Sequence, residues 1–161
     1  MARLNVLEYK ADFIRGWPHG EAVEMNYPTV GTPSAPLGNG DIVKIVDGGV
    51  SEVTAVAATD AYAMIARGQG DTFEQGGTGR GNLYTQVVPN IVLLSNYVVR
   101  TSNVEEALTV GTPCYVSATG GLVNSEAVVD QAVFGTVLEY TTGLQDADGN
   151  TLDHVAVVLV K

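Results

Sequence analysis

The sequence predicts an all-β protein: a small β-barrel or β-sandwich with an extended, proline-rich N-terminal arm and at most one short helix. Three observations favour this class. Valine is the commonest residue, and valine and threonine suit the pleated surface of a strand. Nineteen glycines supply turns between short strands. The sequence contains no long amphipathic stretch with a helical period.

Residues 1–38 differ in composition from the rest, and we expect them to form the arm, followed by a barrel domain over residues 39–161. Four of the six prolines fall in the first segment. Proline fixes its own φ and keeps the preceding residue out of the helical region, so an extended backbone is expected. A disordered tail seldom carries a tryptophan or aromatic residues next to proline, as in Trp17-Pro18 and Tyr27-Pro28. We therefore expect the arm to become ordered on a partner, with Phe13, Trp17 and Tyr27 as its anchors.

The barrel is expected to consist of short strands joined by glycine turns. Asp47-Gly48-Gly49 predicts a hairpin turn, because glycine adopts positive φ at little cost. Ser95-Asn96 marks a bend or a bulge within the most apolar segment. Residues 60–66 fit either a helical turn or a buried strand. The segments expected to form the core are residues 41–57, 87–100, 113–123, 133–141 and 154–160.

Two further segments have a distinct character. Ser102 to Leu108 is the one expected helix, because Ser102 followed three residues later by Glu105 is a capping-box pattern. Gly68 to Gly81 contains six glycines and no recognisable element. Loops of this length in a compact domain are usually functional or mobile.

The sequence also contains a faint internal echo. Thr29 to Pro33 (TVGTP) recurs as Thr109 to Pro113, and the start of a strand in residues 40–50 resembles residues 111–123. We interpret the echo as the same turn chemistry used twice before a strand, with a true duplication as the alternative.

Candidate catalytic groups do not form a recognisable motif. Neither His19 nor His154 belongs to one, and the Gly-x-Ser-x-Gly motif is missing. Cys114 precedes Tyr115-Val116 in an apolar strand, where a thiol is usually a small buried hydrophobe. The glycines of residues 76–81 lack the lysine and the following helix of a phosphate-binding loop. We therefore expect no enzymatic activity and no cofactor.

Asp146 and Asp148 resemble the start of a calcium-binding loop. The positions where such a loop needs a glycine and a glutamate hold Thr151 and Val157. The Asp-Gly-Asn sequence ahead of a strand is better explained as a hairpin turn, and whether the two aspartates bind a cation stays open.

Charge and cysteine content limit the partners. With 18 acidic and 8 basic residues the net charge is −10, which disfavours nucleic acid and an anionic membrane as partners. One cysteine precludes an internal disulfide. No apolar run approaches the roughly 20 residues of a membrane-spanning helix. Because Met1 to Lys10 lacks the apolar core of a signal peptide, we expect the protein to act where it is made or within a larger assembly.

Four stretches carry a resemblance to a known family. Residues 36–43 (PLGNGDIV), 108–116 (LTVGTPCYV), 134–139 (FGTVLE) and 155–160 (VAVVLV) are turn-and-strand sequences. Together they make residues 31–161 similar to the capsid decoration (cement) proteins of tailed bacteriophages. In that family they would be the start of the first barrel strand, a mid-chain turn and strand, and the final pair of strands.

The resemblance implies a structural protein that binds the outside of an assembled capsid, stabilises it and has no enzymatic activity. Its implied partners are the major capsid protein and itself, as a homotrimer or alternatively a homodimer. It would be made in the host cytoplasm and reside on the capsid exterior of the virion. Alternatives are another phage structural component (tail-tube, head-completion or receptor-binding protein), a carboxylate hydrolase, and a barrel for a small ligand.

Overall fold

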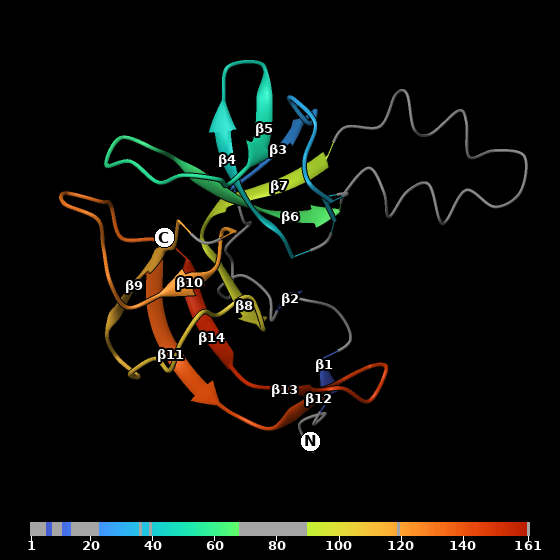
Figure 1. Cartoon of the computed structure of the whole chain (residues 1–161), viewed down its shortest axis with the longest axis vertical. Helices are drawn as coiled ribbons and strands as arrows, with labels where there is room; N and C mark the ends of the chain where they lie inside the picture. The colour runs from blue at the N-terminus through green and yellow to red at the C-terminus, as the bar shows by residue number, and fades with distance from the viewer. Residues whose placement is uncertain are drawn as a thin grey trace, which may run out of the picture.

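The computed structural model describes residues 6–7, 11–13, 23–35, 37–38, 40–67, 90–118 and 120–160. Within these ranges all regular structure is β-strand and there is no helix, which confirms the all-β prediction. Two curled antiparallel sheets contain most of the strands (Figure 1). The strands are β1 (Val6–Leu7), β2 (Ala11–Phe13), β3 (Val23–Tyr27), β4 (Ile42–Val46), β5 (Gly49–Glu52), β6 (Tyr62–Arg67), β7 (Asn90–Ser95), β8 (Tyr97–Thr101), β9 (Pro113–Val116), β10 (Val123–Asn124), β11 (Gly135–Thr141), β12 (Leu144–Asp146), β13 (Thr151–Leu152) and β14 (Val155–Val160).

Apart from β2, the two sheets are built from consecutive parts of the chain, β3 to β7 and β8 to β14. The first, which we call the first half-barrel, has the strand order β3-β7-β6-β4-β5. The second half-barrel has the order β10-β9-β11-β14-β8-β2. A small sheet, β1-β12-β13, lies at the end of the second half-barrel away from the first (Figure 1).

The main hydrophobic core lies between the half-barrels and takes side chains from both. Met64 and Leu93 come from the first, and Val137 and Val158 come from the second. Each of these side chains is at most 7% exposed. Because apolar surface of both sheets is removed from water in one cluster, the half-barrels are expected to unfold together.

A second, smaller core lies on the other face of the first half-barrel. Successive residues of a strand point to opposite faces, so Met64 enters the main core while its neighbours Ala63 and Ile65 enter the second. Val43 and Val92 join them, and all four are fully buried. Burial on both faces explains why β4, β6 and β7 are almost continuously apolar.

The two half-barrels share one topology. In each, an antiparallel hairpin (β4-β5 or β9-β10) pairs through its first strand with the next long strand (β6 or β11). That strand pairs with the last strand of the unit (β7 or β14), which in turn pairs with the strand that precedes the hairpin (β3 or β8). Five strands in each half-barrel therefore follow the same order, and β2 is an addition to the second.

Isolated parallel bridges occur at equivalent points of the two units. Just after β3, Thr29 bridges Val50 of β5, and just after β8, Val104 bridges Val123 of β10. The Val50 amide donates to the Pro28 carbonyl at 3.0 Å, and the Val30 amide donates to the Val50 carbonyl at 2.8 Å. The residues flanking Val104 bond to Val123 in the same way, both at 2.9 Å. Each bridge therefore joins the chain that follows the first strand of a five-strand order, β3 or β8, to the last strand of that order, β5 or β10.

The starts of the two hairpins also match bond for bond. Gly40 and Gly111 have φ values of +88° and +86°. Their amides donate to the carbonyls of Ile65 (2.7 Å) and Val137 (2.8 Å), whose own amides donate back to the residue after each glycine at 2.9 and 3.0 Å. A β-bulge follows both Ile65 and Val137. This level of agreement favours duplication over the interpretation that one turn was used twice.

The expected helix over Ser102–Leu108 is wrong. Its backbone is bent, and the Val104 amide donates to Ser102 at 2.8 Å. In a capping box the Glu105 amide would bond to the Ser102 side chain. Here it donates instead to the carbonyl of Val123. The parallel bridge therefore takes the backbone groups that a two-turn helix needs, and so short a helix is too weak to compete.

Other local predictions are confirmed. Residues 47–48 form the turn between β4 and β5, and Asn96 has a φ of +61° at the bend between β7 and β8. Of the two alternatives left open for residues 60–66, the structure has the strand, as β6. The glycine loop of residues 68–81 lies outside the described residues.

The expected arm, residues 1–38, has described parts with extended backbone. β2 pairs with β8, and β3 pairs with β7 as a strand of the first half-barrel. Beyond β3, the carbonyl of Pro28 accepts a bond from Val50. These parts therefore contact the body of the same chain, and the division into an arm and a barrel at residue 38 stays a prediction.

Candidate functional site

Exposed hydrophobic side chains are distributed unevenly between the half-barrels. Of six large ones among the described residues, one belongs to the first half-barrel (Val30) and five belong to the second. Val129 is the most exposed, at 85%. We call the five residues of the second half-barrel the valine face: Val110, Val128, Val129, Val133 and Leu138.

Strand β9 brings the segments of the valine face together. The amide of Phe134 donates to the carbonyl of Cys114 at 2.9 Å. Because Val133 directly precedes Phe134, this bond holds Val133 near β9. The side chain of Gln131 donates to the carbonyl of Val116, also at 2.9 Å, and holds the loop that carries the two adjacent valines. The hydrogen bonds at the start of β9 place residues 109–112 along β11, which carries Leu138.

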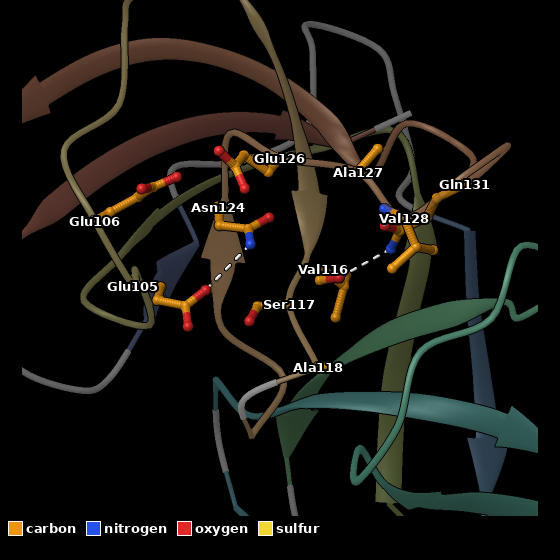
Figure 2. A pocket seen from close by; sticks show the side chains of 10 residues that line it. All are labelled: Glu105, Glu106, Val116, Ser117, Ala118, Asn124, Glu126, Ala127, Val128 and Gln131. Atoms are coloured by element: carbon orange, nitrogen blue, oxygen red, sulfur yellow. Dashed lines mark hydrogen bonds between the residues drawn. The ribbon is translucent and has the colours of Figure 1, made fainter.

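A cavity of about 540 Å³ adjoins the valine face, and Val128 belongs to both (Figure 2). Residues from the bridge segment, from β9 and β10, and from the loop after β10 surround it. Three of the lining side chains are carboxylates, Glu105, Glu106 and Glu126. The complete lining is Glu105, Glu106, Val116, Ser117, Ala118, Asn124, Glu126, Ala127, Val128 and Gln131.

Two of these carboxylates are held by the last residue of β10 and the residue that follows it. The Asn124 amide group donates to Glu105 at 3.1 Å (Figure 2). The hydroxyl and the backbone amide of Ser125 both donate to Glu106, at 2.6 and 3.1 Å. The bonds from Ser125 lower the pKa of Glu106, so that carboxylate is ionised at neutral pH. Chemically, this cavity wall presents hydrogen-bond acceptors and negative charge.

The described residues contain no group of three or more His, Cys, Asp or Glu side chains placed to hold a metal ion. His154 lies immediately before β14, and its Nδ1 is 2.6 Å from the Tyr140 hydroxyl. It lines a separate cavity of about 400 Å³ with Glu105 and Asp153. His19 lies outside the described residues.

Cys114 is a small buried hydrophobe, as expected. Its side chain is 0% exposed within the main core. Burial raises the pKa of the thiol to about 11, so it carries little of the nucleophilic thiolate at neutral pH.

Asp146 stabilises a turn, as the hairpin interpretation predicted. One carboxylate oxygen accepts the backbone amides of Asp148 (3.0 Å) and Asn150 (2.8 Å), and the other accepts the Asn150 side chain (2.9 Å). These bonds lower the pKa of Asp146. Both oxygens therefore bind the N–H groups of the hairpin between β12 and β13.

The three aromatic residues predicted as partner contacts have different positions. Phe13 is in β2, where it pairs with Val99 of β8. Tyr27 is half-buried and packs against the second core, which is a structural position within its own half-barrel. Trp17 lies outside the described residues. Their role as anchors on a partner stays a prediction.

Sequence reasoning missed the valine face. The signal was present in Ala127-Val128-Val129, an apolar run between a glycine turn and the next strand, where a solvated loop would be polar. Val110 and Leu138 gave no such signal, because their exposure depends on which face of the sheet the fold leaves uncovered.

No known protein family, curated protein or solved structure matches this chain significantly. Over the described part of the chain there is no helix of the length and hydropathy needed to cross a membrane. The geometry of the second half-barrel and the sequence resemblance are therefore the grounds for a functional proposal.

Proposed function

We propose that the protein is a structural virion protein that binds the outer surface of an assembled phage capsid and stabilises it, without catalysis. The sequence resemblance to capsid decoration proteins supports this, and so does the small all-β architecture that the resemblance implies. The partners in this proposal are the major capsid protein and further copies of the chain, as a trimer or a dimer.

The concentration of exposed hydrophobic side chains on the second half-barrel is the observation that carries the proposal. Exposed apolar side chains that are concentrated on one part of a protein mark interaction sites more often than scattered ones do. Val129, at 85% exposure, is the natural centre of a contact. On a shell, the same modest contact is repeated at many symmetric positions, so weak single contacts stabilise the whole particle.

The charge of the chain is compatible with a place on the exterior. At −10, neighbouring copies and whole particles repel one another at long range, which keeps a coated shell soluble. Contacts between the protein and the shell would then come from apolar surface at short range, where salt has little effect.

A binding assay with two matched substitutions tests the proposal. Purified protein is mixed with undecorated particles of the phage that encodes the chain, and the fraction that sediments with them is measured. Val129→Asp is expected to weaken binding at least tenfold, because a carboxylate would be desolvated in the contact. Val30→Asp is the matched control, since Val30 is exposed on the first half-barrel, and it is expected to bind like the unmodified protein.

Both variants are expected to remain folded, because each changes an exposed side chain. Circular dichroism and the urea midpoint establish this before the binding assay. The proposal fails if the unmodified protein does not sediment with particles, or if Val129→Asp binds as strongly as Val30→Asp.

A further inference from the structure

The negative charge of the chain is concentrated in the part that carries the valine face. From Ser102 to Val160 the sequence contains eight acidic residues and neither lysine nor arginine. The rest of the chain has ten acidic and eight basic residues and is therefore close to neutral. Because residues 102–160 contain strands β9 to β14, most of the net charge of −10 belongs to the strands and loops around the valine face.

Acidic and apolar side chains are mixed on the loop between β10 and β11. Residues 125–130 are all exposed, and they include Glu126 and Asp130 as well as Val128 and Val129. Glu126 and Val128 also line one cavity, and Figure 2 shows its three glutamates toward one side and Val128 toward the other. A surface that covers the valine face therefore also comes close to these carboxylates.

The loop has a defined conformation, which depends on Gln131. The Gln131 amide donates to the Val128 carbonyl at 3.0 Å, and the Val128 amide donates to the Gln131 side chain at 3.1 Å. The same side chain donates to the Val116 carbonyl at 2.9 Å. Val129 and Asp130 lie at the corner of this turn. A contact surface that is already ordered loses less conformational entropy when a partner binds.

We propose that the partner of the valine face is a basic protein surface, with an apolar centre surrounded by lysine or arginine side chains. The inference rests on the proposed function, because it describes the part of the shell that the valine face would contact. Apolar contact holds the complex at short range. The surrounding charge selects the partner, since opposite charges attract two surfaces before they touch and like charges repel them.

The same charge distribution argues against other macromolecular occupants. A second copy of the chain offers either the same acidic face or a nearly neutral one, and neither is complementary in charge. The phosphates of nucleic acid and of an anionic membrane have the same sign as the face. A basic protein surface is the partner whose charge and apolar centre both match.

The rate of association with undecorated particles of the phage that would encode the chain, captured on a biosensor, tests this inference. The Debye length falls from about 10 Å at ~0.1 M salt to about 3 Å at ~1 M. The association rate constant of the unmodified protein is therefore expected to fall about tenfold or more over this range. The dissociation rate constant is expected to change by less than about twofold, because apolar contact is little affected by screening.

Two double variants make the test specific to the valine face. Glu126→Gln combined with Asp130→Asn is expected to slow association about threefold at the lower salt concentration and to have no effect at the higher one. Asparagine is accepted at position 130, where φ is +61°. The matched control, Asp47→Asn combined with Asp148→Asn, neutralises two exposed carboxylates in other turns and is expected to associate like the unmodified protein.

The outcomes separate this inference from the proposed function. If the unmodified protein does not bind particles at all, both are overturned. If it binds, and Val129→Asp weakens that binding, but association is independent of salt or equal in the two double variants, only the basic partner is overturned. Self-association in sedimentation velocity that Val129→Asp abolishes would make a second copy the occupant, and it would also overturn the inference.

Discussion

The two half-barrels have the same strand order, parallel bridge and bulge position, yet they distribute apolar residues differently. The first buries both faces of its central strands, with Met64 in the main core and Ile65 in the second. The second buries Val137 on its inner face and leaves the adjacent Leu138 40% exposed. One topology therefore supports two distributions of apolar side chains: a unit whose central strands are buried on both faces, and a unit that leaves apolar side chains exposed.

The largest expected loss of stability comes from substitutions in the two hydrophobic cores. Ile65 and Val137 are equivalent, fully buried residues in different cores. Ile65→Ala is expected to lower the free energy of unfolding by about 4 kcal/mol, because it removes three buried carbons and leaves a cavity. Val137→Ala is expected to cost less, since valine loses two carbons. Urea denaturation measures both.

If the half-barrels form one cooperative unit, each core variant shifts a single transition seen equally by fluorescence and circular dichroism. Two separate transitions in Ile65→Ala, with the second unchanged from the unmodified protein, would mean that the shared core does not couple the units.

The bridge of the first half-barrel depends on Gly49. A Cβ atom there would lie 2.2 Å from the carbonyl oxygen of Pro28, a backbone atom that cannot move without losing its bond to Val50. Gly49→Ala is expected to lower stability by about 3 kcal/mol through overpacking. Gly111→Ala is the control: its φ of +86° is unfavourable for alanine, but its Cβ would meet nothing within 4 Å, so the expected loss is about 1–2 kcal/mol. Equal losses in the two variants would show that the close approach at Gly49 has no special cost.

The smallest expected effect concerns an ion pair in the first half-barrel. Asp60 lies 2.9 Å from Lys44, and their side chains are 18% and 20% exposed. The bond from Lys44 holds the pKa of Asp60 below its ordinary value of 3.8, assisted by the Ala57 amide. A lowered pKa stabilises the fold above pH 3.8, and this contribution disappears as the pH falls through the folded-state value.

Asp60→Asn is therefore expected to lower stability at pH 7 by about 0.5–1 kcal/mol, the size typical of a pair that water still screens. The loss should shrink as the pH falls below 3.8 and be absent at the acid end of the titration, once the carboxyl is protonated in the folded state. Asp47→Asn, at an exposed turn of the same sheet, is the control and should change stability by less than about 0.5 kcal/mol throughout the titration. A loss in Asp60→Asn that is independent of pH would exclude the charge as its cause.

Much of the fold could be predicted from the sequence because local chemistry determines it. Valine-rich runs became strands, and the turns at Gly48 and Gly149 have the positive φ that favours glycine. The helix prediction failed because capping chemistry at Ser102 is local, whereas the bridge from Val104 to Val123 joins residues 19 positions apart.

The duplication was harder to judge from the sequence. The clearest echo, TVGTP, is not structurally equivalent in its two copies: Thr29 forms a bridge, while Thr109 belongs to the turn before Gly111. The true equivalence, Gly40 with Gly111, preserves backbone conformation and hydrogen bonds but few side chains. The valine face was missed for a related reason, since exposure follows from sheet packing and not from residue type.

The central proposal, that the chain is a capsid decoration protein, is tested most directly by a cryo-electron microscopy map of purified particles of the phage that would encode it. The account predicts density for the protein on the outside of the shell, with Val129 and the rest of the valine face against the capsid surface and the first half-barrel away from it. Density confined to the tail, or a shell contact made by the first half-barrel with the valine face exposed to solvent, would contradict it.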